Sequence, residues 1–435
     1  MKRWRTDRRL RHRHVAAALA FFVGAVAAGW PEVGSAETQL SSPAVFSAAG
    51  LAHIGDYMKN EVVTGKIPGA VVLIQQHGRP VYFESFGLRD VATKVPMTTD
   101  TIFPLYSMSK PITSVAAMML VDDGKLRLDD LVSKYIPAFT EEKVGVEKCC
   151  KDGKPALVLE PVSRPITIED LLRHTSGLTY GFYGDSAVRK IYANSDLFEG
   201  DFDNAQFAER IARLPLAEQP ETLWDYGHST DVLGRVIEIA SGQSLFAFEK
   251  SRLLDPLGMT DTAFYVADAA KRALIAEPLP DDRFASPVAG IRDHPMSPAR
   301  WESGGAGMLG TIGDYARFSQ MLLNGGAFDG KRYLKPETIA LMTSDHIGPE
   351  TKIARDGYYF PGDSSGFGLG FAVRTGHAED AGWPLGEYRW DGVGGSSFFI
   401  DPKDDMFTIC MMQSPSQRGR IETELKALVY KALGR

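Results

Sequence analysis

A serine and a lysine three residues apart are the residues of this sequence best suited to chemistry. Ser107 and Lys110 stand at the start of an apolar run that continues to Leu120. If that run is a helix, both side chains project from the same face. A serine hydroxyl attacks well once a base takes its proton, and a lysine whose pKa is lowered by its surroundings is such a base. The spacing indicates nucleophilic catalysis, although a helix-capping serine beside a solvated lysine gives the same pattern.

Two later stretches carry groups that can assist a nucleophile. Tyr226 lies in an expected loop before a helix, where a nearby cation can lower its pKa and make it a proton shuttle. The alternative is an aromatic plug. His228 either bonds substrate or caps the following helix. Residues 388–396 run from a strand into a glycine-rich bend, where a backbone N–H can hold an oxyanion; a hairpin with a β-bulge is the alternative.

In this order, the motifs resemble those of the serine β-lactamase and penicillin-binding-protein family. The resemblance is strongest to class C β-lactamases and to family VIII carboxylesterases, and it extends from about residue 46 to the C-terminus. The stretches that carry it are S-M-S-K at 107–110, L-L-R-H-T-S-G-L at 171–178, Tyr226 with D-V-L-G-R-V-I-E at 231–238, S-G-G-A-G-M-L-G at 303–310, and the strand of Trp390.

The resemblance implies an acyl-enzyme mechanism without a metal or organic cofactor. Ser107 would attack a carbonyl carbon, and Lys110 and Tyr226 would share the proton transfers. The backbone N–H groups of Ser107 and Val393 would form the oxyanion hole, because Val393 follows the family's third motif. Water would then release the acyl group.

Two departures from the β-lactamase pattern bear on the substrate. The third motif of β-lactamases begins with a cation, where this sequence has Trp390 followed by Asp391. The second motif usually ends in asparagine, and here it has His228. Both changes resemble the esterase branch, although Asp391 departs even from that. We predict that His228, Trp390, Asp391 and Gly392 contact the substrate.

The resulting prediction is an exported serine hydrolase acting on short or otherwise neutral esters. One alternative is a β-lactamase or a D-alanyl peptidase, and another is a non-catalytic binding protein on the same fold. Two further patterns are set aside. The G-x-G-x-x-G match at 305–310 follows no strand, so a dinucleotide site is not expected. The resemblance places His174 in a structural turn and not in the role of catalytic base.

Strand-like stretches lie near both ends of the sequence and helical stretches between them. Joined, they predict an α+β fold of the β-lactamase/transpeptidase type: an antiparallel sheet flanked by helices, beside an all-helical region. The site is expected where the two regions meet. The expected strands are 69–74, 81–86, 366–374, 387–390, 396–400 and 406–412; the expected helices are 46–63, 107 to about 122, 168–173, 205–214, 231–240 and 422–433; and 141–165 is expected to be a loop or insertion.

Residues 1–36 are typical of a secretory signal peptide. Seven basic residues precede an apolar run from Val15 to Trp30, and the small residues 34–36 suit cleavage. The run is too short for a comfortable membrane span. We therefore expect export to the periplasm or the medium, a single hydrolase domain at 37–435, and no stable membrane span after cleavage.

The composition of the whole chain is that of a soluble globular protein, with 44% hydrophobic and 24% charged residues. The net charge of −7 includes +5 from residues 1–36, so residues 37–435 carry −12. This charge argues against binding to nucleic acid or anionic membranes, and the expected partner is a small ester or amide. Cys149, Cys150 and Cys410 are too few for a zinc site; one of the first two could bridge to Cys410, or all three are free.

Overall fold

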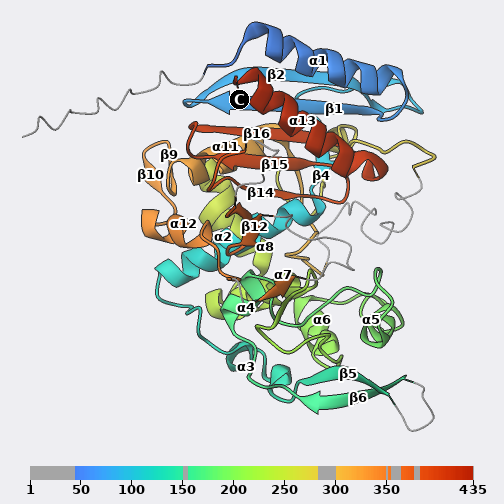
Figure 1. Ribbon diagram of the computed structural model, residues 1–435, viewed down its shortest axis with the longest axis vertical. Helices are drawn as coiled ribbons and strands as arrows, with labels where there is room; N and C mark the ends of the chain where they lie inside the picture. The colour runs from blue at the N-terminus through green and yellow to red at the C-terminus, as the bar shows by residue number, and fades with distance from the viewer. Residues whose placement is uncertain are drawn as a thin grey trace, which may run out of the picture. The chain divides into compact units, whose positions relative to one another are not determined.

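An eight-stranded antiparallel sheet separates two layers of helices (Figure 1). The computed structural model describes residues 45–149, 155–282, 300–348, 351–353, 364–376 and 383–434. The strand order is β12-β13-β14-β15-β16-β1-β2-β3. Ala70 pairs with Met412, so strands from both ends of the sequence join in one sheet, as predicted. Its strands are β1 (Gly69–Gln76), β2 (Arg79–Asp90), β3 (Val95–Pro96), β12 (Ser365–Phe367), β13 (Ala372–Arg374), β14 (Tyr388–Asp391), β15 (Ser397–Asp401) and β16 (Met406–Met412).

Side chains of β1 fill two separate cores. Val71 and Leu73 belong to the core shared with the larger helical layer. Ala70, Val72 and Ile74 belong to the core beneath the terminal helices. Successive residues of a strand face opposite sides of the sheet, so burial of both faces accounts for the unbroken apolar run at the start of this strand.

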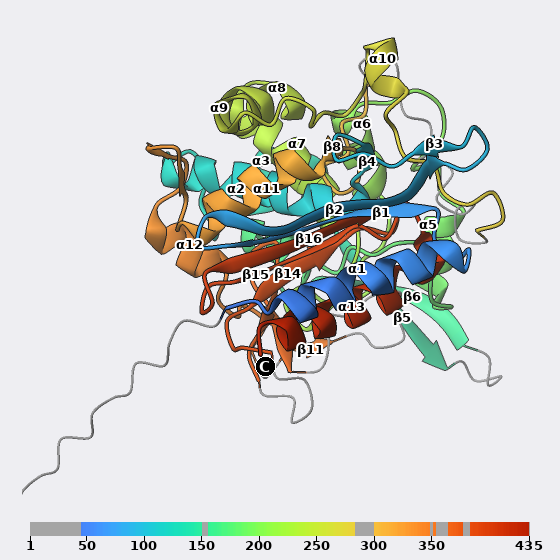
Figure 2. The same ribbon diagram turned by 90° about the horizontal axis from the view of Figure 1, so that it is seen from above.

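The terminal helices α1 (Ala48–Val63) and α13 (Arg418–Ala432) pack together on one face of the sheet (Figure 2). Ser47 caps α1, because its side chain accepts a hydrogen bond from the Gly50 N–H. A Cβ atom at Gly50 would lie only 2.5 Å from the Cα of Ala432. Glycine thus allows the two helices to cross closely. Both predicted helices are confirmed, and α13 begins four residues before the predicted start at residue 422.

The opposite face carries the predicted helical region (Figure 2). Every residue from Ser109 to Leu120 in α2 is buried, and this helix packs against α7. α11 contacts β15 and β16 and so attaches the region to the sheet. The helices are α2 (Ser109–Asp122), α3 (Val132–Tyr135), α4 (Ile168–Leu172), α5 (Ala187–Ala193), α6 (Asn204–Ile211), α7 (Ser229–Ser241), α8 (Leu245–Glu249), α9 (Asp255–Leu257), α10 (Ala269–Arg272), α11 (Ile312–Leu323) and α12 (Pro336–Met342).

Short strand pairs lie outside the main sheet. β4 pairs with β8 antiparallel, and this pair joins the chain before Ser107 to the end of the glycine-rich stretch at 303–310. The pairs are β4 (Ile102–Pro104) with β8 (Leu309–Thr311), β5 (Lys143–Cys149) with β6 (Pro155–Pro161), β7 (Leu223–Trp224) with β11 (Lys352–Ile353), and β9 (Ala327–Phe328) with β10 (Lys331–Arg332).

Two predictions of local structure are wrong. Residues 141–165, predicted to be a loop or insertion, contain the β5–β6 hairpin. Its strands are joined by an ion pair between Lys148 and Glu160, so the charged composition that suggested a loop belongs to an exposed strand pair. The single strand predicted over 366–374 is instead the pair β12 and β13. The chain turns between them at Gly370, whose φ of +101° favours glycine.

Several predictions concern residues that the structure does not describe in full. The signal peptide at 1–36 and Cys150 lie outside the described residues, and the side chain of Cys149 is not described. Cys410 is buried and free, so the alternative in which it forms a disulfide is not adopted. Within the described ranges, no helix is both long and apolar enough to cross a membrane. The chain from Pro43 to Arg435 forms one compact unit.

Candidate active site

Ser107 lies at the junction between a short 3₁₀ turn and the buried helix α2. The turn η1 spans Tyr106–Met108 and α2 begins at Ser109, so Ser107 precedes the helix that it was predicted to start. Ser107 is partly exposed, whereas Lys110 is buried. Tyr106 has a φ of +48°, a left-handed conformation that is costly for residues other than glycine and that recurs at functional sites. The local backbone therefore presents Ser107 at the edge of a buried segment.

The side chain of Lys110 meets three hydrogen-bond acceptors. Its Nζ donates to the Gly305 carbonyl at 2.7 Å, the Tyr180 hydroxyl at 3.1 Å and the Ser107 Oγ at 3.4 Å. A neutral amine keeps two N–H donors and gains one lone pair. A carbonyl can only accept, so Gly305 holds one donor and the Tyr180 hydroxyl can accept the other. The lone pair is then left for the Ser107 hydroxyl proton, which is the geometry that a general base requires.

The electrostatic surroundings of Lys110 favour that neutral form at mildly alkaline pH. Burial disfavours the ammonium ion and lowers the pKa of Lys110 to about 8. The charges of Asp231 and Asp391 act in the opposite direction and limit the shift. Lys110 can therefore exchange a proton within the pH range in which a protein of this kind is stable.

Two tyrosines flank Lys110, and only Tyr226 was identified from the sequence. The ring centroid of Tyr226 lies 4.7 Å from the Lys110 Nζ. The rings of Tyr180 and Tyr226 meet in a T-shaped arrangement with centroids 5.5 Å apart. Tyr180 follows the H-T-S-G-L stretch, which indicated only a turn, so no signal in the sequence singled it out. Proton transfer by Tyr226 stays a prediction, and Tyr180 is a second candidate for it.

Asp231 joins two segments, 228–231 and 303–305, beside the carbonyl that receives Lys110. Its Oδ2 accepts from the His228 Nδ1 at 2.9 Å, and its Oδ1 accepts from the Ser303 Oγ at 2.6 Å and the Gly305 N–H at 3.0 Å. Burial opposes ionisation of Asp231, but the His228 hydrogen bond and the nearby Lys110 charge keep the pKa of Asp231 below its usual value. The carboxylate therefore holds the Gly305 N–H, and the carbonyl of the same residue holds Lys110.

His228 occupies the residue before α7, yet its side chain makes no capping hydrogen bond. The helix-capping alternative is therefore not adopted. Because a carboxylate can only accept a hydrogen bond, the His228 Nδ1 is the donor and carries a hydrogen. The His228 ring also lies 4.4 Å from the ring of Tyr180. Contact with substrate stays a prediction for His228.

The glycine-rich bend after β14 packs against the chain that leads to Ser107. A Cβ at Gly392 would lie 2.4 Å from the Leu105 carbonyl oxygen, and a Cβ at Gly394 would lie 2.7 Å from the aromatic ring of the turn η1. Only glycine permits so close an approach of two backbones. Val393 is thereby held beside the Ser107 segment. Its backbone N–H as part of an oxyanion hole stays a prediction.

Trp390 and Asp391 are buried, successive residues of β14, the strand that precedes this bend. The Trp390 ring lies 5.3 Å from the ring of Tyr226 and 5.2 Å from that of Phe367. Trp390 thus supports the position of Tyr226, and its contact with substrate stays a prediction. Asp391 is also buried, and its negative charge reaches Lys110.

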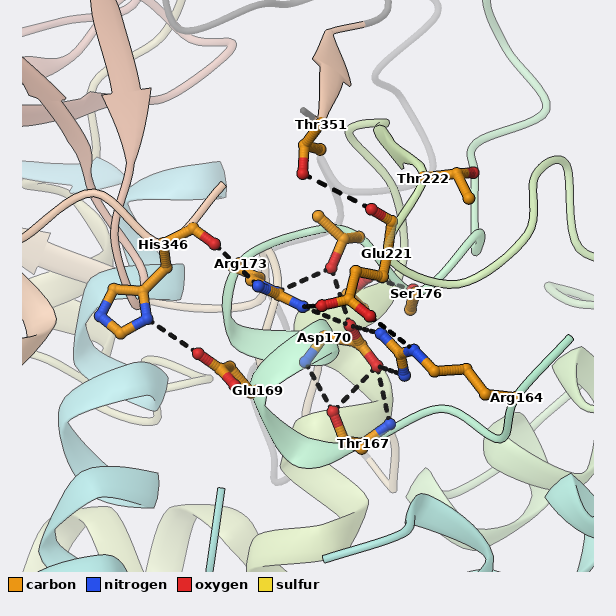
Figure 3. Close-up of polar contacts among 12 residues, drawn as sticks. Arg164, Thr167, Glu169, Asp170, Arg173, Ser176, Glu221, Thr222, His346 and Thr351 are labelled. Atoms are coloured by element: carbon orange, nitrogen blue, oxygen red, sulfur yellow. Dashed lines mark hydrogen bonds and ion pairs between the residues drawn. The ribbon is translucent and has the colours of Figure 1, made fainter. Parts of the chain in front are cut away.

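A buried ion network anchors the segment that leads to Tyr180 (Figure 3). Asp170 is completely buried and accepts hydrogen bonds from Arg164, Arg173 and Thr175. Removing one member of such a network leaves an uncompensated buried charge, which costs about 3–5 kcal/mol. The network therefore holds the start of this segment in place, and the segment continues to Tyr180, which contacts Lys110.

His174 occupies the structural turn that was predicted for it. Its φ is +57°, and its ring lies 5.0 Å from that of Tyr226. Burial, assisted by the positive charge of Lys110, lowers the pKa of His174 well below its usual value. The imidazole is therefore neutral and packs behind Tyr226.

A buried carboxyl group lies behind the lysine. The Thr113 hydroxyl, one helical turn after Lys110, lies 3.0 Å from the Glu249 Oε1 and 2.9 Å from the Gly304 carbonyl oxygen. Glu249 is completely buried, and its Oε2 atom has no hydrogen-bond partner among the described residues. Burial raises the pKa of Glu249 well above its usual value. A protonated Glu249 can donate to Thr113, which then donates to Gly304, next to the residue that holds Lys110.

We expect the stability of the protein to show the titration of Glu249. Between the unfolded pKa of about 4.5 and the higher folded pKa, the unfolded state ionises and the folded state does not, so the free energy of unfolding falls as pH rises. Glu249→Gln removes this titration. The difference in free energy of unfolding between the variant and the wild type should therefore grow in favour of the variant as pH rises, by up to about 1.4 kcal/mol per pH unit. Urea unfolding at several pH values from 5 to 8 measures the difference.

The matched control is Glu209→Gln, which changes an exposed glutamate of α6 in the same way. Its unfolding curves should follow those of the wild type at every pH. Parallel pH dependence in the Glu249→Gln variant and the wild type would show that Glu249 ionises normally in the folded protein.

Two other arrangements were considered as functional sites. Across the described ranges, no group of three or more His, Cys, Asp or Glu side chains is placed to hold a metal ion. A cavity of about 830 Å³ is lined by residues that include Arg173, Glu221 and His346, drawn in Figure 3, but not by Ser107 or Lys110. The serine and the lysine therefore do not belong to this cavity.

Comparison with known proteins gives one consistent family. A family model described as "Beta-lactamase" matches residues 52–431. "Protein Rv1367c" of Mycobacterium tuberculosis is 36% identical over 359 residues, which cover 80% of this chain and 86% of the relative. "Esterase EstB" of Burkholderia gladioli is 32% identical over 386 residues, which cover 82% and 90% of the two chains.

The fold is also that of a solved hydrolase. The structure of "EstCE1, a hydrolase with promiscuous acyltransferase activity" matches with a TM-score of 0.70 and 27% sequence identity. The match covers 88% of this chain and 99% of the other. Most of the described helices and strands therefore have counterparts in that enzyme.

Proposed function

We propose that this chain, a serine hydrolase of the beta-lactamase family, hydrolyses neutral carboxylic esters through an acyl-enzyme on Ser107. The observation that carries this proposal is the buried Lys110, whose ammonium group is held 3.4 Å from the Ser107 Oγ by two fixed acceptors. A lysine whose pKa is about 8 can take the hydroxyl proton as the oxygen attacks.

In the proposed reaction, the Ser107 Oγ forms a bond to the ester carbonyl carbon, and its proton moves to Lys110. The resulting oxyanion is held by the backbone N–H groups of Ser107 and Val393. The C–O bond to the alcohol then breaks, and the alcohol leaves with a proton delivered by Lys110 through Tyr226 or Tyr180. Water then attacks the acyl carbon and gives its proton to Lys110. The bond from that carbon to the Ser107 Oγ breaks, the proton returns to the Oγ, and the carboxylic acid leaves.

The charges around the site favour esters over β-lactams. Common β-lactam drugs carry a carboxylate, which β-lactamases hold with a cation at the start of their third motif. In this chain, Trp390 and the buried Asp391 stand there, and a negative Asp391 repels a carboxylate. A neutral ester meets no such repulsion. The esterase named among the relatives is consistent with this preference.

A substrate panel tests this ranking. We expect kcat/KM for p-nitrophenyl acetate and butyrate to exceed that for nitrocefin and for a D-alanyl-D-alanine peptide by about tenfold or more, the effect of one missing charged hydrogen bond. A preference for nitrocefin or for the peptide would instead support the alternative of a β-lactamase or D-alanyl peptidase.

Export belongs to the same proposal. It is supported by the basic and apolar pattern of residues 1–36, and it places the hydrolase in the periplasm or the medium. The intact mass of the protein recovered from these fractions measures whether the residues before Glu37 are lost. Recovery of the full-length chain in the cytoplasm would contradict export without affecting the proposed chemistry.

A further inference from the structure

Two exposed phenylalanines lie beside the candidate site. Phe182 is 63% exposed and Phe198 is 56% exposed. Burying a side chain of this size is worth about 1.5–3 kcal/mol, so leaving both in water forgoes a sizeable stabilisation. Contiguous exposed apolar groups commonly mark a surface that binds an apolar ligand.

Aromatic contacts connect both phenylalanines to Lys110. The Phe182 ring lies 4.8 Å from that of Tyr180, and the Phe198 ring lies 5.7 Å from that of His228. Tyr180 and His228 contact each other, and the Tyr180 hydroxyl receives a hydrogen bond from Lys110. The exposed rings are therefore continuous with the groups around the proposed nucleophile.

The core holds this surface in place. Phe198 lies 5.5 Å from the partly buried Trp301. Trp301 in turn stacks on the buried Phe207, with ring centroids 5.1 Å apart and planes 22° from parallel, and lies 5.1 Å from the buried Phe202. A surface supported in this way loses little conformational entropy when it binds a ligand. We name Phe182, Phe198 and Trp301 the aromatic rim.

Most of the charged side chains next to the aromatic rim are paired with one another. Residues 185–203, which contain Phe198, include five acidic and two basic residues. One of those bases, Arg189, is buried in an ion pair with Asp225. Four of the five acidic side chains also form ion pairs: Asp185 with Lys190, Asp196 with Arg213, and Asp201 and Asp203 with Arg300. A ligand group that binds here therefore meets mainly apolar rings, against which a charged group is unfavourable to bury.

We propose that the aromatic rim binds a bulky, uncharged apolar group of the ester that Ser107 attacks. The substrates are then esters whose acyl chain or alcohol is large and apolar, and not esters of small polar acids. This inference rests on the proposed ester hydrolysis and adds to it the class of substrate. The acyl chain and the alcohol share the required chemistry, and the choice of test substrates separates them.

The test compares the double variant Phe182→Ser, Phe198→Ser with the wild type on three esters. Ethyl acetate has two small groups, ethyl octanoate a large acyl chain, and benzyl acetate a large alcohol. We expect the variant to lose about tenfold in kcat/KM on at least one of the bulky esters, as for other lost apolar contacts, and less than twofold on ethyl acetate. A loss confined to ethyl octanoate assigns the acyl chain to the rim, and a loss confined to benzyl acetate assigns the alcohol.

Phe83→Ser is the matched control, because Phe83 is 44% exposed on β2, in the main sheet. It should leave all three rates unchanged. Equal rates for the double variant and the wild type on every ester would overturn the inference while leaving the proposed function in place, as would an equal loss with Phe83→Ser. Absence of Ser107-dependent hydrolysis of any ester by the wild type would overturn the proposed function, and the inference with it.

Discussion

Ser107→Ala is expected to abolish ester hydrolysis, lowering kcat by on the order of 10⁴-fold or more, because no other atom can form the acyl-enzyme bond. The fold should be unaffected. The Ser107 side chain is partly exposed, and its hydrogen bond with Lys110 is long at 3.4 Å, so the free energy of unfolding should change by less than about 1 kcal/mol. Steady-state rates and urea unfolding measure the two effects separately.

Ser109→Ala is the matched control for this experiment. The Ser109 side chain is completely buried and accepts a hydrogen bond from the Met308 N–H at 3.1 Å. Its loss should cost about 1–3 kcal/mol of stability, because that N–H is left unsatisfied. Intact-protein mass spectrometry after treatment with a fluorophosphonate should show one adduct on the wild type and on Ser109→Ala. An adduct on Ser107→Ala would identify a different nucleophile.

Lys110→Met is the second substitution expected to have a large effect. Methionine keeps an unbranched side chain of similar length in the buried position, so the fold is retained and only the base is lost. We expect kcat/KM to fall by on the order of 10³-fold, the usual contribution of a general base. In the wild type, kcat/KM should rise with pH and level off above about pH 8, as Lys110 loses its proton. The residual rate of the variant should lack this rise.

Substitution of the neighbouring Asp391 tests whether Lys110 is the group that titrates. The negative charge of Asp391 raises the pKa of Lys110, so Asp391→Asn should move the midpoint of the pH–rate profile to lower pH. Asp56→Asn, an exposed substitution on α1, should leave it in place. An unchanged midpoint in Asp391→Asn, or a rise with pH that persists in Lys110→Met, would assign the titration to another residue.

The pattern along the chain was sufficient to predict most of the sheet and the long helices other than α11. α1 was predicted because its apolar residues recur at helical spacing, and β16 (Met406–Met412) because it is a β-rich run, which is buried along its whole length. The β5–β6 hairpin was missed because the charged and proline-containing composition of this stretch indicated a loop. Lys143, Glu147 and Lys148 of β5 are exposed, whereas Val144, between them, is buried in the core.

The same division holds within the candidate site. Ser107 and Lys110 were recognised because a three-residue spacing brings two side chains together within a single turn, whatever the rest of the fold does. Tyr226 and the glycine-rich bend were noted from their residue types, and the resemblance to a family then favoured a catalytic role over the structural alternatives. Tyr180 and Glu249 gave no such signal, because neither residue type nor local spacing distinguishes them from ordinary core residues.

The sequence alone predicted that Ser107 and Lys110 lie together, because that pairing depends on the geometry of one short segment. The tertiary structure alone decided what surrounds it. Lys110 is 70 residues from Tyr180 and 195 residues from Gly305 in the sequence, and its lowered pKa comes from burial among segments that the sheet and helices bring together. Burial and long-range contacts follow from how distant segments pack, and the pattern of any one segment does not contain that information.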